Sequence, residues 1–481
     1  MDMKRFLKLS VFVAFLLTSF VACKHQPKEQ KIYFVTTNDL HAAIDNFPKA
    51  IAVIDSLRTA HPDMILLGAG DNRSGNPIND RYSKVAYPMV ALMNEAGFEA
   101  SAFGNHEWDG GPQALSDVVS WSNFPYLCAN VTFDDSLNIP CLPYKIFERN
   151  GLKIGVIGAI QVGENGLPDF HPKHSSGSHF QKIEDVLPQY QTLRDSCNVL
   201  VMLSHCGHEE ERELAGKFTW LDAIFGGHSH TKVAETTIVN GVLVTQAEYK
   251  LKYLTLSTFT LMDGKVVDKK QELVSVANST LTNEKAQAMV DEFNNNDVFE
   301  QVLAENEADI VDIGSMGCFM ADAIRTVAGT DLAFQNYGGV RYYDTLRKGP
   351  FILKTLYALD PFDNEIIRFD LTGKEIVDML TVAYPTDNRV GPVLCSGCTY
   401  EYKIKDGEMT DIKVKLDNGK PLEMDKKYSV VMNSYMSSVF DFEHEDDGTS
   451  TFMTSNEMSI EYLKDHPTIN YSKVKRTFEK K

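Results

Sequence analysis

Short apolar runs of strand type alternate with helix-type runs along the first half of this chain, from Lys31 to about Asn240. The strand-type runs are at residues 32–37, 64–67, 154–160, 199–203 and 222–225. The helical patterns include residues 50–57 and 88–93. This alternation predicts an α/β domain with packed sheets. Two later runs, at residues 242–246 and 253–261, are typical of antiparallel strands.

The length of 481 residues predicts more than one domain, because single hydrophobic cores stop growing at about 250–300 residues. A polar, helix-permissive stretch at residues 282–307 is the best candidate boundary. We therefore expect five segments. They are a signal peptide at 1–22, a tether at 23–31, a first domain at 32–280, a linker helix at 281–307 and a second domain at 308–476.

The N-terminal segment has the features of an export signal. Three basic residues precede an apolar run at 9–20, which is too short to span a bilayer comfortably, and a small-residue cleavage site follows. Cys23 directly after Ala22 resembles a bacterial lipobox, which implies lipidation of Cys23 and anchoring to a membrane. The alternative is a plain secretory signal with an incidental cysteine.

The net charge limits the kinds of binding partner, and the cysteine content bears on disulfide formation. The formal net charge is -19, so a nucleic-acid duplex or an anionic membrane surface is an unfavourable partner. Seven cysteines follow Cys23, an odd and dispersed set that predicts no disulfide framework. Cys395 and Cys398 have redox-motif spacing but lack a strand-to-helix context, so we interpret them as structural, with redox chemistry as the lesser alternative.

Metal-ligand residue types occur where five of the apolar runs end. The sets are Asp39-Leu-His41, Gly70-Asp71, Gly104-Asn-His-Glu107, His205 and Gly226-Gly-His-Ser-His230. Strand ends of an α/β sheet meet at one crevice, so we expect these side chains to converge. Carboxylate, imidazole and amide donors without cysteine suit Mn, Zn, Fe or related ions, and a carboxylate on a tight turn, Asp71, could bridge two of them.

These motifs resemble those of the calcineurin-like metallophosphoesterases, in particular the 5'-nucleotidase branch, over essentially the whole mature chain. The resemblance implies a four-layer α/β/β/α sandwich followed by an α/β substrate-binding domain. It implies two divalent ions (Mn, Zn, Fe, Co or Mg). One ion would be bound by Asp39, His41, Asp71 and His230. The other would be bound by Asp71, Asn105, His205 and His228.

The resemblance also implies the catalytic pair, His106 and Asp109. In such enzymes, water activated by the metals attacks phosphorus in line with the leaving oxygen. His106, oriented by Asp109, would then stabilise the transition state and assist departure of the leaving group.

The second domain is expected to select the substrate. Asn336-Tyr-Gly-Gly-Val-Arg341 resembles a nucleotide-binding segment of 5'-nucleotidases, which implies roles for Asn336, Gly338 and Arg341. Further resemblances imply base contacts from Phe362, Asn364 and Tyr435, with the base stacked between the two rings. Composition alone would equally place both rings in a core.

Two departures from the family pattern bear on the substrate. Asp312 stands where the family commonly has a phosphate-binding Arg, and Arg73 could replace that donor or be a surface residue. An insertion at 439–445 precedes Asp447, the counterpart of an acid that contacts ribose in the family.

Two further polar clusters carry less signal. His171, His174 and His179 have no familiar metal spacing and predict a surface loop. Glu209, Glu210 and Glu211 open a helical pattern, where acids are favourable without any function.

The combined hypothesis is an exported, lipid-anchored dimetal phosphohydrolase, periplasmic or on the cell surface, that releases phosphate from nucleotides. An alternative keeps the metals but hydrolyses a 2',3'-cyclic nucleotide or a nucleotide sugar. A third, from a different class, is a non-catalytic surface lipoprotein that binds nucleotides.

Overall fold

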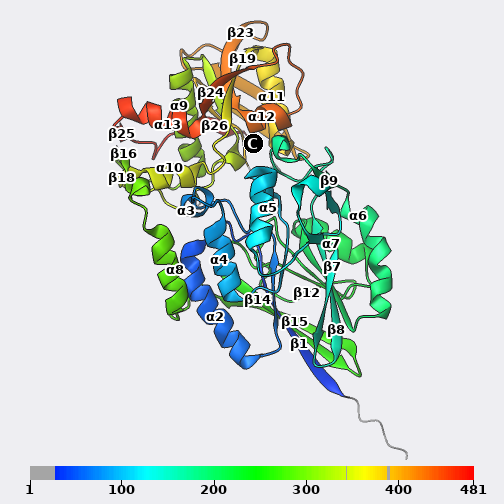
Figure 1. Cartoon of the computed structure of the whole chain (residues 1–481). Helices are drawn as coiled ribbons and strands as arrows, with labels where there is room; N and C mark the ends of the chain where they lie inside the picture. Colours follow the sequence, from blue (N-terminus) through cyan, green and yellow to red (C-terminus); the bar gives the residue numbers. More distant parts are fainter. Residues whose placement is uncertain (1–27, 343, 387–390, 481) are drawn as a thin grey trace, which may run out of the picture.

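A computed structural model describes residues 28–342, 344–386 and 391–480 and shows two domains stacked end to end (Figure 1). Cys23 and the expected signal peptide lie outside the described residues. Within those residues, no helix is long and apolar enough to cross a membrane.

The N-terminal domain contains two large sheets that pack face to face. The strands of the first sheet, in spatial order, are β15 (Lys265–Ser275), β14 (Tyr253–Met262), β1 (Glu29–Thr37), β2 (Ile65–Ala69), β3 (Ala100–Ala102), β4 (Tyr126–Leu127) and β6 (Cys141–Leu142). Those of the second are β12 (Thr237–Val239), β13 (Val242–Thr245), β11 (Ala223–Phe225), β10 (Val199–His205), β8 (Leu152–Ile160) and β7 (Tyr144–Arg149). Apolar side chains from both sheets, including Phe34, Leu67, Val201 and Phe225, fill the space between them.

Helices cover the outer face of each sheet. The first sheet is covered by α2 (Phe47–Ala60), α4 (Tyr87–Ala96), α5 (Gly111–Trp121) and α8 (Glu284–Asn294). The second is covered by α6 (Ile183–Val186), a 3-10 segment at Leu187–Asp195 and α7 (His208–Lys217). The order helix, sheet, sheet, helix is the expected four-layer sandwich.

Local sequence explains where the helices begin and end. Pro48 and Pro88 lie in the first turns of α2 and α4, where a missing N–H costs nothing. Gly97 ends α4 with a φ of 75°, a left-handed conformation that glycine adopts without strain. The strands β1, β2 and β3 run parallel, and so do β8, β10, β11 and β13, so their carboxyl ends face the same edge.

The C-terminal domain is built on a five-stranded sheet. Its strands, in order, are β20 (Leu394–Ser396), β17 (Leu332–Gln335), β23 (Lys427–Asn433), β19 (Glu365–Thr372) and β24 (Thr449–Thr454). Two three-stranded sheets flank it: β18 (Gly349–Ile352), β16 (Val302–Asn306) and β25 (Thr468–Ile469), and β22 (Glu408–Leu416), β21 (Cys398–Lys405) and β26 (Thr477–Glu479). The helices are α9 (Ile313–Ala328), α10 (Leu353–Leu359), α11 (Gly373–Thr386), α12 (Ser434–Val439) and α13 (Ser455–Asp465).

Two details differ from the sequence-based expectations. Strand β13 is antiparallel to β12 but parallel to β11, because it follows a crossover within the second sheet. The stretch expected to be a linker divides between the domains. Helix α8 packs Val290 and Phe293 into the core of the N-terminal domain, whereas β16 pairs with β18 in the C-terminal domain.

Candidate dimetal centre and domain interface

Seven side chains with metal-ligand chemistry converge at the carboxyl ends of the parallel strands. Asp39 and His41 follow β1, Asp71 follows β2, and Asn105 follows β3. In the other sheet His205 ends β10, and His228 and His230 follow β11. The structure thus brings together all seven residues expected to bind metal, most of them buried.

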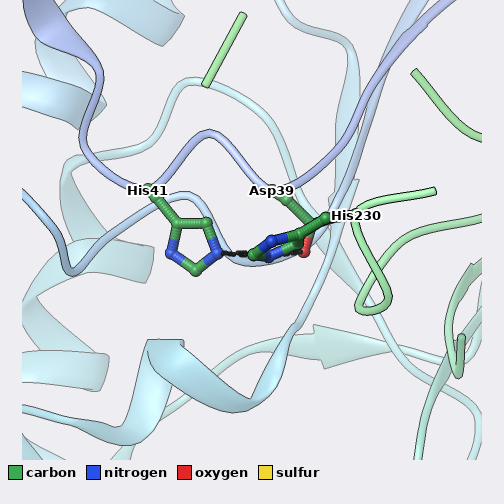
Figure 2. A group of neighbouring side chains, drawn as sticks. All are labelled: Asp39, His41 and His230. Atoms are coloured by element: carbon green, nitrogen blue, oxygen red, sulfur yellow. Dashed lines mark hydrogen bonds and ion pairs between the residues drawn. The ribbon is translucent and has the colours of Figure 1, made fainter. Parts of the chain in front are cut away.

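The ligand atoms form two neighbouring groups. Asp39, His41 and His230 form one group, with His41 Nε2 and His230 Nε2 only 2.9 Å apart (Figure 2). Asp71, His205 and His228 form the other. Asn105 belongs with the second group, because its Oδ1 lies 3.0 Å from His228 Nδ1.

Asp71 lies between the two groups. Its Oδ2 is 3.1 Å from His205 Nε2 on one side and 3.9 Å from His41 Nε2 on the other. Its Oδ1 accepts a hydrogen bond of 2.9 Å from the backbone N–H of His106. A Cβ at Gly104 would collide with this carboxylate, so the glycine makes room for it.

The ligand-bearing turns have unusual backbone conformations. Positive φ values occur at Asp39 (50°), His41 (42°), Asp71 (53°), His228 (79°) and His230 (54°). Non-glycine residues seldom adopt this region, and such conformations concentrate at functional sites. Their occurrence at five of the seven positions indicates that these turns are shaped to aim side chains at one point.

The electrostatics of this cluster favour a cation. Burial and the neighbouring His230 lower the pKa of His41, so this imidazole is neutral and able to coordinate. Burial lowers the pKa of His205, but the nearby Asp71 carboxylate raises it more strongly. The resulting pKa of His205 is about 10. A proton on His205 thus balances the buried carboxylates, and divalent ions could replace that positive charge.

The donor set fits two divalent cations. His41 and His230 present ring nitrogens to each other, and only one of the two can carry the shared proton. His205 Nε2 is buried without a well-oriented hydrogen-bond partner. Separations near 3 Å between donor atoms are those expected at neighbouring corners of a shell with bonds of about 2.0–2.2 Å.

His106 and Asp109 lie beside the cluster. His106 Nδ1 is 2.7 Å from Asp109 Oδ2. Burial disfavours the protonated imidazole, but Asp109 and Asp71 outweigh burial and raise the pKa of His106. His106 also groups with His41 and Asp71 as a possible ligand, although its Nε2 is 4.0 Å from Asp71 Oδ2.

The C-terminal domain reaches this same point. Arg341 Nη2 donates to His106 Nε2 over 2.9 Å, and the Phe362 ring stacks on the His106 ring at 5.7 Å. The backbone N–H of Arg341 is bonded to Leu359 O, which ties the Arg341 segment to the segment that carries Phe362. The Arg341 guanidinium also lies over the Phe362 ring at 5.2 Å.

Other expected substrate residues occupy several environments. Asn336 is buried and its Oδ1 accepts from Asn433 Nδ2 over 2.9 Å, so it supports the domain framework. Gly338 and Asn364 are partly exposed in the segments carrying Arg341 and Phe362. Tyr435 is also partly exposed, and its ring contacts Phe440.

Asp447 is not brought to this group. It is exposed, and the adjacent Asp446 accepts from the backbone N–H of Asp370 on β19. On β19, Ile366 pairs with Asn433, and Asp370 lies four residues further along the strand. Four residues of a strand span about 13 Å. The sequence-based assignment of Asp447 as a ribose contact therefore stays a prediction.

The structure explains the departure at Asp312 and shows the surroundings of Arg73, the possible replacement donor. Asp312 is the N-cap of α9 and accepts from Ser315 N over 2.9 Å. Arg73 is only 5% exposed and lines an internal pocket with Glu107 and Tyr126. Burial alone would raise the pKa of Asp109, but His106 and, more weakly, Arg73 act against burial, so the pKa of Asp109 is lowered overall. Arg73 is thus a buried neighbour of the catalytic pair.

Two buried glutamates that sequence reasoning missed tie the ligand turns together. Glu107 accepts from the backbone N–H groups of Asp71, Asn72 and Gly104. Glu211 accepts from the backbone of Gly227 at 3.1 Å and from Gln246 Nε2 at 3.0 Å. Burial raises the pKa of each carboxyl to about 7. The helix-start interpretation of Glu211 was therefore incomplete, since its side chain is fully buried.

The remaining clusters are structural or lie at the interface. His171 Nε2 lies 3.2 Å from Ser434 Oγ of the C-terminal domain. The loop that carries His171 therefore contacts the other domain and is not only a surface loop. Arg81 pairs with Asp363 at 2.8 Å, a second contact between the domains. Cys395 and Cys398 are buried free thiols, and a hydrogen bond with Cys398, together with burial, raises the pKa of Cys395.

A paired-sheet domain that gathers seven metal-binding side chains, with a second domain reaching into the same point, defines a two-domain metallohydrolase. Residues 32–232 match the model of the calcineurin-like phosphoesterases, and residues 294–442 match that of the 5'-nucleotidase C-terminal domain. Residues 32–232 thus form a calcineurin-like phosphoesterase domain, and residues 294–442 form a 5'-nucleotidase C-terminal domain. The chain is a metal-dependent phosphoester hydrolase, and calcineurin-like phosphoesterases use two divalent ions.

Relatives span either the whole chain or most of it. Protein UshA of Salmonella pullorum is 26% identical, with 96% of each chain covered. The trifunctional nucleotide phosphoesterase protein YfkN of Bacillus subtilis is 26% identical over 84% of this chain, which spans only 31% of that longer protein. A 5'-nucleotidase precursor from Thermus thermophilus has the same fold, with a TM-score of 0.82 and 24% identity over 94% of this chain and 99% of that one.

Proposed function

We propose that this chain releases phosphate from nucleotides at a site shared by its two domains. The observation that carries the proposal is the meeting of Arg341 and His106 beside the metal-ligand cluster. A guanidinium is suited to phosphate oxygens, and His106 Nε2 is directed at the same position. A phosphate group there would be contacted by both domains at once.

The two ions proposed to be held by the seven ligands supply positive charge for phosphate oxygens and lower the pKa of water. Asp109 accepts the Nδ1 proton of His106 and so fixes the ring with Nε2 facing Arg341. In the described state Nε2 accepts from Arg341 and therefore carries no proton. If a phosphate oxygen took the Arg341 N–H and His106 became protonated, as its raised pKa favours, Nε2 could donate a proton or a hydrogen bond to the leaving oxygen while Arg341 stabilised charge on the phosphoryl group.

The nucleotide part of the substrate would be held by the C-terminal domain. Phe362 already faces the catalytic histidine, and Tyr435 lies in the first turn of α12, whose first residue, Ser434, contacts His171. The family match of residues 294–442 supports a nucleotide as the substrate class.

A phosphodiesterase activity is the second candidate. The C-terminal domain presents Arg341, while Asp312 occupies the position of a second family arginine and caps a helix instead. A diester carries less charge on phosphate than a monoester and requires fewer cationic contacts. The YfkN relative, named a trifunctional nucleotide phosphoesterase, is consistent with a range of esters in this family.

The deciding experiment is hydrolysis of a substrate panel after chelation and readdition of Mn, Zn, Mg or Co, with phosphate release measured for monoesters and chromatography of the products for cyclic nucleotides and nucleotide sugars. We expect metal-dependent hydrolysis of nucleoside 5'-monophosphates above that of 2',3'-cyclic nucleotides and nucleotide sugars. Preferential cleavage of the cyclic nucleotides would favour the diester alternative. Failure with every ester and every metal would contradict hydrolysis at this site.

Export and lipid anchoring form a separate part of the proposal. The described chain begins with β1 at the tip of the molecule opposite the C-terminal domain, so an anchor at Cys23 would leave the interface facing away from its attachment (Figure 1). Cys23→Ser should abolish fatty-acyl labelling and release the protein from membranes. Unchanged labelling would refute the lipobox, whereas Ser19→Ala, in the same segment, should leave it intact.

A further inference from the structure

Asp169, in the loop between β8 and the 3-10 turn at Pro172–His174, contacts two of the proposed metal ligands. Its backbone carbonyl accepts from Asn105 Nδ2 over 2.8 Å. Its side-chain Oδ2 lies 3.3 Å from His228 Nε2. Asn105 and His228 are the pair whose other donor atoms, Oδ1 and Nδ1, lie 3.0 Å apart.

These contacts determine which atoms remain for a cation. A carboxylate accepts hydrogen bonds, so Asp169 favours the His228 tautomer with its proton on Nε2 and the lone pair on Nδ1. A backbone carbonyl accepts only, so it holds the amide nitrogen of Asn105 and leaves Oδ1 free. Both donor atoms then face the same position, beside Asp71 and His205.

We propose that Asp169 is a positioning residue for the second metal ion, through its side chain on His228 and its main chain on Asn105. This inference rests on the proposed metal site. A carboxylate behind a metal-binding histidine fixes the ring and makes it a stronger ligand, and its loss typically weakens metal binding about 10–100-fold.

The first group is supported by partners of another kind. His41 Nδ1 lies 3.0 Å from a backbone carbonyl, Ser74 O, and His230 stacks on the Tyr249 ring at 4.9 Å. The two ions should therefore respond differently when the Asp169 carboxylate is removed.

The test is a stepwise Mn²⁺ titration, at neutral pH, of full-length protein from which metal has been removed with a chelator. Calorimetry measures the binding of each ion, and EPR detects the coupled ion pair. Asp169→Asn and Asp169→Ala should bind the first ion within about twofold of wild type and the second about 10–100-fold more weakly. Asp169→Glu should recover part of the affinity. Glu164→Gln is the matched control, because Glu164 lies on the same loop and pairs with Lys182 at the surface.

Three results would overturn the proposal. Wild-type affinity for both ions would show that Asp169 does not act on His228. Equal weakening of both ions, with a lower unfolding temperature in chelator, would indicate a general structural role. Complete loss of the second ion at saturating Mn²⁺ would make Asp169 a ligand. Asp71→Asn is titrated in parallel, because normal binding of two ions by that variant would refute the metal site itself.

Discussion

The two carboxylate oxygens of Asp71 have different contacts. Oδ1 accepts from the backbone N–H of His106, and Oδ2 faces His205 and His41. We predict that Asp71→Asn loses both metal and activity while the fold survives. Asparagine tolerates the φ of 53° at this position and keeps the acceptor for His106 N–H. Metal analysis, turnover and circular dichroism check the prediction. Near-wild-type turnover with full metal content would contradict the assignment of Asp71 as the bridge.

His106 differs from the seven ligands in its ring contacts, because Nδ1 faces Asp109 and Nε2 accepts from Arg341. We predict that His106→Asn retains both ions but lowers kcat about 100-fold or more, because it removes proton donation and charge stabilisation at the leaving oxygen. Asp109→Asn should lower kcat less, since the ring remains but loses its orientation. If His106→Asn instead lost an ion, the grouping of His106 with His41 and Asp71 would be a true ligand set.

At the scale of elements, the strand ends depend on buried carboxylates that connect one turn to the next. Glu211, on the first turn of α7, bonds to the backbone of Gly227 and to Gln246, which in turn donates to Gly227 O. Glu107 does the same for the turns after β2 and β3. Each ligand turn with a positive φ is thus held by bonds from a different element.

We predict that Glu211→Ala lowers the free energy of unfolding by about 2–5 kcal/mol, because it leaves several buried donors without an acceptor. Metal affinity should fall as well, since the His228 turn loses its support. Glu209→Ala is the control, because Glu209 is on the same helical turn but exposed and paired with Arg212. Chemical denaturation of both variants measures the difference. Equal stability of the two would show that the Glu211 bonds contribute little.

Sequence reasoning predicted the strand ends and the convergence of the metal-ligand types, because apolar runs and the polar residues that follow them are local patterns. It did not predict Glu107, Glu211 or Asp169, whose roles depend on which turns meet in space. Glu211 resembles its neighbours in sequence, the exposed Glu209 and the partly buried Glu210, and only packing distinguishes it. The role of Asp447 stays a prediction, because an insertion hides which acid lies near the substrate.

At the scale of the whole molecule, neither domain contains the complete site. The N-terminal domain carries the metal ligands and the His106–Asp109 pair, and the C-terminal domain carries Arg341 and Phe362. The domains are joined near this point by Arg81 with Asp363 and by His171 with Ser434. With a net charge of -19, the protein as a whole repels phosphate esters, so their attraction must come from the metal ions and Arg341.

Because the C-terminal domain would hold the base and the N-terminal domain the metals, the contribution of the C-terminal domain to substrate binding can be measured apart from the phosphoryl chemistry. If Phe362 and Tyr435 hold a base, truncating either removes stacking on a part of the substrate remote from phosphorus. A small aryl phosphate lacks the base and does not use that contact. We predict that Tyr435→Ala lowers kcat/KM for a nucleotide at least about tenfold, or about 1.4 kcal/mol, and changes that for the aryl phosphate less than about threefold.

Tyr435→Phe is the matched control for this prediction, because it keeps the ring and its contact with Phe440. It should retain most of the nucleotide activity. Equal losses on nucleotide and aryl phosphate in Tyr435→Ala would indicate that the ring supports the domain or its docking through the adjacent Ser434. No loss on either substrate would mean that the C-terminal domain selects another phosphate ester. The metal centre would then stand, because its ligands all lie in the N-terminal domain, and the nucleotide assignment would fall.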